Sequence, residues 1–342
     1  MKQQDSSLLS IVKLTKLILL MVGLLFFTAV ISTAYLLRDG GDKPIFSIVL
    51  PNGQEEEGIE QYQKKEFFIV KDTSGLGQSL EEEYIKYGYT LINETYKHIG
   101  PLADNPDMRY AGNNLACKNC HLDAGQKKFA APYVGLFGLF PQYRGRENKI
   151  GTLEERINGC MERSMNGKKL PKDGKEMKAM VAYMKWLSEG VPTGTKLEGR
   201  GFLALQVPDR KADLGKGKEV YAKKCQSCHG QEGKGVSNDI GGYIYPPLWG
   251  EDSYNHGAGM HRVLTAARFI KGNMPLGATY EKPLLSDEEA FDVAAYINSH
   301  SRPLKENTEK DYPDLSRKPM DSPYPPFADN LSAEQHKYGP FH

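Results

Sequence analysis

Residues 117–121 read CKNCH, and residues 225–229 read CQSCH. The pattern C-x-x-C-H is the attachment signature of c-type haem: both thiols bond to the porphyrin, and the adjacent histidine ligates the iron. Zinc-binding or redox C-x-x-C pairs share part of this pattern, but two complete copies in one chain favour haem. The sequence therefore predicts two covalently bound haems, attached by Cys117, Cys120, Cys225 and Cys228, with His121 and His229 as iron ligands.

The composition limits the possible functions. Of the 342 residues, 39% are hydrophobic and 25% are charged, which is usual for globular domains. The formal net charge is +1, so no overall basic field indicates nucleic acid as a partner. Of the five cysteines, four belong to the haem motifs and Cys160 is left over. An odd cysteine in an exported protein requires a reason.

Each haem motif follows a helical pattern, which begins near residue 79 in the first half and covers 217–224 in the second. Each half then ends in another helix, started by Asp173 with Glu176 in one and by a Ser286/Glu289 capping box in the other. Tyr183 and Tyr296 occupy matching places in these closing helices, which indicates an internal repeat. We therefore expect a mainly α fold of two tandem class I cytochrome c-like domains. The expected boundaries are a transmembrane or signal segment at 1–38, a spacer at 39–80, domains at 81–195 and 196–303, and an extended wrapping tail at 304–342.

The N-terminal segment contains a mostly apolar run at 17–37, long enough to span a bilayer as a helix. Three lysines precede the run, so its N-terminal end is expected in the cytoplasm and the haem domains outside. Residues 32–34 resemble a signal-peptide cleavage site, but the length of the run favours an uncleaved anchor. The protein is thus expected on the periplasmic face of the inner membrane, or free in the periplasm if it is cleaved after Ala34. Short strands are expected in the spacer at 45–50 and at 67–70.

The sixth iron ligands can be sought by spacing. In the second half Met274 is favoured over Met260 and His261, because it lies 45 residues after His229 in a glycine-flanked loop. A methionine ligand also suits electron transfer. In the first half Met165 follows His121 at nearly the same distance as Met274 follows His229. Cys160, the leftover thiol, lies a few residues earlier, and the residues alone leave Met165 and Cys160 equally eligible.

A short helix is predicted around Cys160, from a Thr152/Glu155 capping box to a stop at Asn166-Gly167. On such a helix Arg156, Cys160 and Arg163/Ser164 share one side. Residues 142–172 contain eight basic and four acidic residues, and a positive patch beside a haem favours an anionic substrate. The planar fork of arginine suits oxyanions.

Several motifs resemble those of the dihaem thiosulfate dehydrogenase/tetrathionate reductase family, over about residues 83–342. They are LDAG at 122–125, FPQYR at 140–144, GTLE at 151–154, NGCMERSMNG at 158–167 and SAEQHKYGP at 332–340. The resemblance implies that Cys160 is the distal ligand of the first haem. It implies substrate-contacting roles for Arg146, Arg156 and Ser164, and stable His/Met ligation at the second haem, since Asn273 and not lysine precedes Met274.

The reaction implied by the resemblance is oxidative coupling of two thiosulfates to tetrathionate, or its reverse. Electrons would pass from haem 1 to haem 2 and on to an external carrier, either a c-type cytochrome or a membrane redox partner. Arginines would offset the repulsion of two dianions, and a transient Cys–S–SO₃⁻ adduct is expected on Cys160. The alternatives are a non-enzymatic, membrane-anchored dihaem electron shuttle and a dihaem peroxidase.

Overall fold

The computed structural model describes residues 16, 19–25, 27–28 and 67–341. The chain divides into two compact units, Met1–Lys65 and Glu66–His342. In the first unit, residues 19–25 and 27–28 are helical and exposed. Within the described ranges no helix is both long and apolar enough to cross a membrane. Most of the apolar run at 17–37, and the whole of the strand expected at 45–50, lie outside the described residues.

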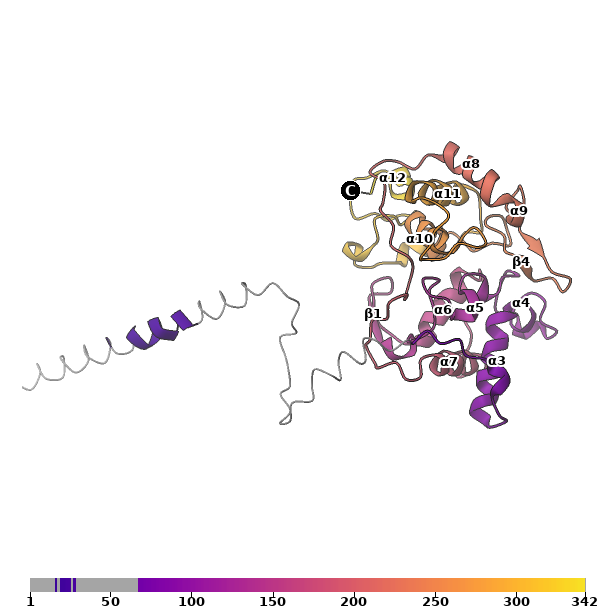
Figure 1. Ribbon diagram of the computed structural model, residues 1–342, viewed down its shortest axis with the longest axis horizontal. Helices are drawn as coiled ribbons and strands as arrows, with labels where there is room; N and C mark the ends of the chain where they lie inside the picture. The colour runs from indigo at the N-terminus through magenta and orange to yellow at the C-terminus, as the bar shows by residue number, and fades with distance from the viewer. Residues whose placement is uncertain (1–15, 17–18, 26, 29–66, 342) are drawn as a thin grey trace, which may run out of the picture. The chain divides into compact units, whose positions relative to one another are not determined.

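The second unit begins with a helical half that contains the first haem motif (Figure 1). Its elements are α3 (Leu80–Asn93), α4 (Thr95–His98), α5 (Leu122–Gly125), α6 (Leu153–Arg163) and α7 (Lys175–Leu187), with β1 (Gln142–Arg144) antiparallel to β2 (Lys149–Gly151). The predicted start of α7 is wrong: its N-cap is Gly174, not Asp173, and no side chain caps the helix. The strand expected at 67–70 is also wrong. This segment is irregular, and Lys71 just after it is tied by its backbone N–H to the Gln126 side chain instead of to a strand.

The other half of this unit contains the second haem motif. Its elements are α8 (Leu214–Lys224), α9 (Gln226–His229), β3 (Val236–Ser237), β4 (Tyr243–Tyr245), α10 (Val263–Asn273), α11 (Asp287–Ser299) and α12 (Ala333–Tyr338). β3 and β4 pair antiparallel. The Ser286/Glu289 capping box predicted at the start of α11 is confirmed.

Both halves are organised around the same helix crossing. A Cβ added to Gly88 on α3 would lie 2.1 Å from the Ala179 carbonyl oxygen on α7. A Cβ added to Gly217 on α8 would lie 2.1 Å from the Asp292 carbonyl oxygen on α11. In each crossing the next side chain, 2.8 Å away, is one of the two tyrosines of the predicted repeat, Tyr183 or Tyr296. The helix before each haem motif therefore packs backbone to backbone against the closing helix of its half.

Two separate hydrophobic cores result. The first includes Leu91 and Ile92 of α3 together with Met177, Met180 and Tyr183 of α7. The second is built mainly from α8, α10 and α11, and it also contains one residue from the first half, Ala130.

The halves are joined by specific polar contacts. The Asn114 N–H and Nδ2 donate to the Asp252 carboxylate at 3.0 and 3.1 Å. Asn255 Nδ2 donates to the carbonyl of Glu162 on α6 at 2.9 Å. The segment at 252–255 thus fastens the second half to the end of α6 and to the residues just before the first haem motif.

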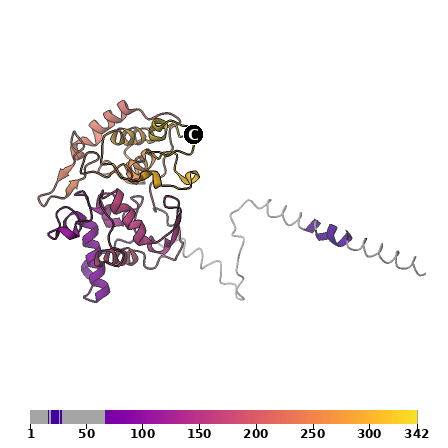
Figure 2. The same ribbon diagram turned by 180° about the vertical axis from the view of Figure 1, so that it is seen from behind.

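The C-terminal tail contacts both halves. Arg163 at the end of α6 donates to the Asp311 carboxylate at 2.7 Å, and the Tyr312 N–H donates to the Arg146 carbonyl at 2.8 Å. Further along, the Ala212 N–H donates to the Tyr338 carbonyl at 2.9 Å. Seen from behind, the yellow C-terminal end lies on the half that contains α8 to α11 (Figure 2).

Candidate haem sites and catalytic cavity

A cavity in the first half brings the first haem motif and α6 together. Cys117, Cys120 and His121 contribute to its lining, and so do Arg156 and Cys160 of α6. It contains about 1060 Å³ of space between protein atoms, part of which is open to solvent. The lining is mostly apolar, as expected for a site that takes a large planar porphyrin.

His121 is held ready to ligate a metal. Its Nδ1–H donates to the Ala131 carbonyl at 2.6 Å, which leaves Nε2 as the ring nitrogen with a free lone pair. The Tyr133 ring packs against the imidazole with 4.6 Å between centroids. Burial lowers the pKa of His121 to about 4, so the imidazole is neutral at pH 7. Two cysteines and a neutral, oriented histidine at one cavity fit a covalent c-type haem.

Helix α6 provides another wall of this cavity. The predicted Thr152/Glu155 capping box starts it, and its C-cap is Ser164, two residues before the predicted stop at Asn166-Gly167. One turn apart on the helix, Arg156 Nη1 donates to Cys160 Sγ at 2.8 Å. Ser164 also lines the cavity.

Both candidates for the sixth ligand of the first haem are present at the cavity. Met165 is 3% exposed and lines the cavity together with Cys160, and its N–H donates to the Cys160 carbonyl at 3.0 Å. Cys160 differs from Met165 because its sulfur accepts a hydrogen bond from the Arg156 guanidinium.

Arg146 lies elsewhere. It is not part of the cavity lining. Its Nη1 donates to the Gly257 carbonyl at 3.3 Å and its Nε to the Tyr312 hydroxyl at 3.4 Å. The structure therefore brings Arg156, Cys160 and Ser164 together at the cavity, and places Arg146 between the second half and the tail.

The second haem motif has the same local design. The His229 Nδ1–H donates to the Pro246 carbonyl at 2.8 Å, and burial lowers the pKa of this histidine. Met274 follows α10 directly, is half-buried and packs against the second core. Of the competing ligands, His261 uses its Nδ1–H on the His256 carbonyl at 2.8 Å, and Met260 lines the cavity of the first half.

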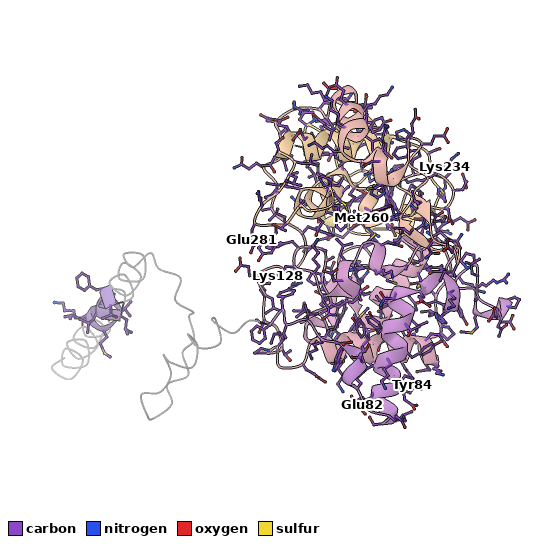
Figure 3. The ribbon with its side chains drawn as sticks, turned by 45° about the vertical axis from the view of Figure 1, so that its right-hand side comes forward. Glu82, Tyr84, Lys128, Lys234, Met260 and Glu281 are labelled. Atoms are coloured by element: carbon purple, nitrogen blue, oxygen red, sulfur yellow. The ribbon has the colours of Figure 1, made fainter. Side chains whose placement is uncertain are left out.

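Residues of the second half complete the first cavity, which no sequence pattern indicated. Tyr254 and Met260 belong to the second half, Arg200 and Gly201 to the connection between the halves, and all four contribute to the lining. Met260 lies where the two halves meet (Figure 3). No local motif could have revealed these residues, because only folding brings them near the CKNCH segment.

The loop at 129–131 lies between the two sites. The Ala131 carbonyl accepts the hydrogen bond from His121, and the Phe129 carbonyl accepts one from Asn273 Nδ2 at 3.1 Å. Between them, Ala130 is fully buried in the second core.

Comparison with known families and proteins agrees with this arrangement. A family model described as SoxA/TsdA, cytochrome c domain, matches residues 108–193, and a cytochrome c model matches residues 214–301. Thiosulfate dehydrogenase of Stutzerimonas stutzeri is 43% identical over 65% of this chain and 68% of its own length. Thiosulfate dehydrogenase of Allochromatium vinosum is 46% identical over 59% of this chain and 76% of its own.

A solved structure is similar as well. Thiosulfate dehydrogenase (TsdBA) from Marichromatium purpuratum is 38% identical, with a TM-score of 0.63. The match covers 69% of this chain and half of that longer chain. Identity at this level over two thirds and more of the curated relatives shows that the chain belongs to the thiosulfate dehydrogenase family.

Proposed function

We propose that the protein is a dihaem thiosulfate dehydrogenase that couples two thiosulfates to tetrathionate, or runs the reverse reaction. The observation that carries this proposal is Cys160, a thiol with an arginine donor 2.8 Å from its sulfur, in the same cavity as the first haem motif. A non-enzymatic electron shuttle has no need of this arrangement, and the family disfavours it.

The protein binds two haem c groups covalently. Cys117, Cys120 and His121 would hold the first, and Cys225, Cys228 and His229 the second, each with its histidine Nδ1 fixed on a backbone carbonyl. Cys160 would provide a further ligand to the first haem iron, and Met274 a further ligand to the second. When bound, each haem supplies one-electron redox chemistry, and electrons pass from the first to the second and on to an external carrier.

The side chains at the cavity handle anions. Arg156 lines the cavity and carries a fixed positive charge, which offsets the repulsion between two thiosulfate dianions. Ser164 adds a hydroxyl donor to the lining. For Arg146 the resemblance alone implies a substrate-contacting role, since its guanidinium lies outside the lining and donates to the Gly257 carbonyl and the Tyr312 hydroxyl.

Cys160 is proposed as the nucleophile, since a thiolate is the reactive form of cysteine. Once free of the iron, its sulfur would bond to the terminal sulfur of thiosulfate, giving Cys–S–S–SO₃⁻, and the two electrons released would be accepted by the two haems. The terminal sulfur of a second thiosulfate then attacks the sulfur attached to the sulfonate, and tetrathionate leaves as the Cys160 thiolate re-forms. Charge and atoms balance in both steps, whereas the shorter Cys–S–SO₃⁻ adduct expected from the sequence lacks one sulfur.

Each haem can accept one electron, so the two electrons released in one turnover would reduce both haems before the carrier oxidises them again.

The haem domains are proposed to lie in the periplasm, attached to the inner membrane by the apolar run at 17–37 or released by cleavage after Ala34. The composition of that run and the lysines before it support this placement.

Replacement of Cys160 by alanine tests the proposal. Thiosulfate-dependent ferricyanide reduction, and tetrathionate consumption with a reduced dye, should both be lost while both haems stay attached. Met165→Leu, a swap of similar volume on the same wall, should remain active. Electron paramagnetic resonance of the oxidised wild type should show a low-spin His/thiolate species that the alanine variant lacks. Full turnover by Cys160→Ala, or two ordinary His/Met haems in the wild type, would contradict the assignment.

A further inference from the structure

Arg302, just after α11, is a buried cation that no carboxylate in the described part of the chain neutralises. It is 7% exposed. Its Nη2 donates to the Ile297 carbonyl at 3.0 Å, and its guanidinium carbon lies 4.3 Å from the centre of the Tyr254 ring. Its Nε and Nη1 are shielded from solvent and have no hydrogen-bond partner among the described residues. The ion pairs that arginines form in the described residues belong to Arg144, Arg163, Arg210, Arg262 and Arg317, and Arg302 is not among them.

Neighbouring basic residues raise the free energy of burying the charge of Arg302. The pKa of Lys337 is lowered, mainly because the lysine is buried and secondly because the positive charge of Arg302 lies nearby. Burial, and then Arg302, lower the pKa of His261 to about 3. Arginine does not lose its proton in proteins, so it cannot relieve this field by becoming neutral. A buried, permanently charged group with two free donors therefore requires an anion that these residues do not supply.

The position of Arg302 indicates which anion this is. Tyr254, on which the guanidinium stacks, lines the cavity of the first haem motif, and its hydroxyl donates to Asn298 Oδ1 at 3.0 Å. Asn298 Nδ2 in turn donates to the carbonyl of Met260, which also lines that cavity. Arg302 itself belongs to the half that holds the second haem. It thus lies at the boundary between two sites that each take a porphyrin with two carboxylates.

We propose that Nε and Nη1 of Arg302 bind a carboxylate of a haem at this boundary. A covalently attached haem is always present, so its carboxylate compensates the buried charge permanently. Thiosulfate would leave the arginine bare between turnovers. The inference requires the two haems but not the thiosulfate chemistry, so it stands or falls separately from the proposed reaction.

The expected consequence is electrostatic. An uncompensated carboxylate beside a haem stabilises the oxidised, more positive iron, and a cation on that carboxylate cancels the effect. Arg302 should therefore keep the reduction potential of the haem that it contacts higher than it would be without this cation. Because the effect acts through charge, it should be visible without substrate.

Spectroelectrochemistry of the dihaem protein without thiosulfate tests this. Arg302→Gln should lower the potential of one haem and leave the other unchanged, and Arg302→Lys should preserve most of the wild-type value. The haem that moves, identified by its own absorption and paramagnetic spectra, is the source of the carboxylate. Arg317→Gln is the matched control, because Arg317 also stacks on a tyrosine, Tyr143, but is well exposed and paired with Asp314. It should change neither potential.

Unchanged potentials of both haems in a fully haem-loaded Arg302→Gln protein would overturn the proposal. So would a shift that occurs only after thiosulfate is added, since this would make the substrate the missing anion. If Arg302→Gln fails to fold, resonance Raman spectroscopy of the wild type and of Arg302→Lys replaces it. The haem carboxylate bending modes should then differ between the two proteins, and identical modes would refute the contact.

Discussion

At the residue scale, Arg156 and Cys160 set the chemical character of the cavity. They are one turn apart on α6, so the helix itself brings the guanidinium to 2.8 Å from the sulfur. The donor holds the thiol in place, and the fixed charge attracts anions to it. A single helical turn thus provides both the proposed nucleophile and its positive environment.

Arg156→Gln should lower kcat/KM for thiosulfate about 10- to 100-fold, because a hydrogen bond to a charged group contributes about 1.5–3 kcal/mol. Steady-state ferricyanide reduction measures this. Lys172→Gln removes the same charge from an exposed residue that is paired with Glu155, and should leave the rate nearly unchanged. Equal losses in the two variants would show that net charge, not the position of Arg156, matters.

Met274→His should lower the reduction potential of the second haem, since methionine ligation raises the potential relative to histidine. Met260→Leu should leave that potential in place, because Met260 faces the cavity of the first half. Potentiometric titration of both variants distinguishes the two methionines. The opposite pattern would make Met260 the ligand.

Sequence reasoning works at this scale wherever the chemistry is local. The haem motifs, the capping box of α6 and the Arg156–Cys160 turn depend on residues a few positions apart. The choice between Met165 and Cys160 could not be made from spacing, because both residues reach the same cavity. Arg302 and Tyr254 carry no motif, and only the tertiary structure shows their stacking.

At the element scale, the crossing of α8 with α11 fixes the helix that leads into the second haem motif. Gly217 has no Cβ, and this lets the backbones of the two helices touch. The same is true of Gly88 at the crossing of α3 with α7. Each crossing determines where the following C-x-x-C-H segment emerges.

Gly217→Ala should destabilise the protein by about 1–3 kcal/mol, as overpacking does in well-packed interiors. The added methyl would clash with the Asp292 carbonyl, which is backbone and cannot turn away. Urea unfolding followed by circular dichroism measures the loss. Gly215→Ala in the same helix should be close to neutral, because its methyl would meet only the Asp213 carboxylate at 3.2 Å. A neutral Gly217→Ala variant would show that the helices can separate without cost.

The helices themselves were largely predictable, since periodicity, capping residues and breakers are encoded in neighbouring positions. The exceptions have physical reasons. Asp173 does not cap α7 because the helix starts one residue later, after Gly174. The short strands β1 to β4 were not predicted, because pairs of only two or three residues leave little alternation to detect.

At the scale of the whole molecule, the tail and the segment at 252–260 hold the two halves in one arrangement. Asp311 is central to the tail's contribution, because its carboxylate accepts from Arg163 at 2.7 Å and from the Tyr324 hydroxyl at 2.8 Å. Arg163 ends the helix that carries Cys160. The tail therefore supports α6 through a contact with its last residue.

Asp311→Ala should destabilise the protein by about 3–5 kcal/mol, the usual cost of leaving one partner of a buried ion pair without its counter-charge. Urea unfolding measures the change, with haem absorbance reporting on each half. Asp314→Ala in the same tail should cost about 1 kcal/mol or less, because the half-exposed Asp314 caps a short turn and pairs with Arg317, which is well exposed. Equal effects would mean that the Asp311 pair is not specific.

Two cytochrome c domains and a wrapping tail could be expected from repeated motifs and from the aromatic, proline-rich C-terminus. How the two domains and the tail are arranged relative to one another could not be predicted from the sequence. The contacts of Asp252 with Asn114 and of Asp311 with Arg163 join residues well over a hundred positions apart, and no local pattern selects such pairs.

The loop at 129–131 contacts residues of both candidate haem sites. One of its carbonyls orients the imidazole of the first site, another holds the side chain next to Met274, and the residue between them is locked into the second core. A change in the segment that leads to Met274 is therefore expected to shift the carbonyl that orients His121. Variation in the two potentials across natural variants of this chain should for that reason be correlated.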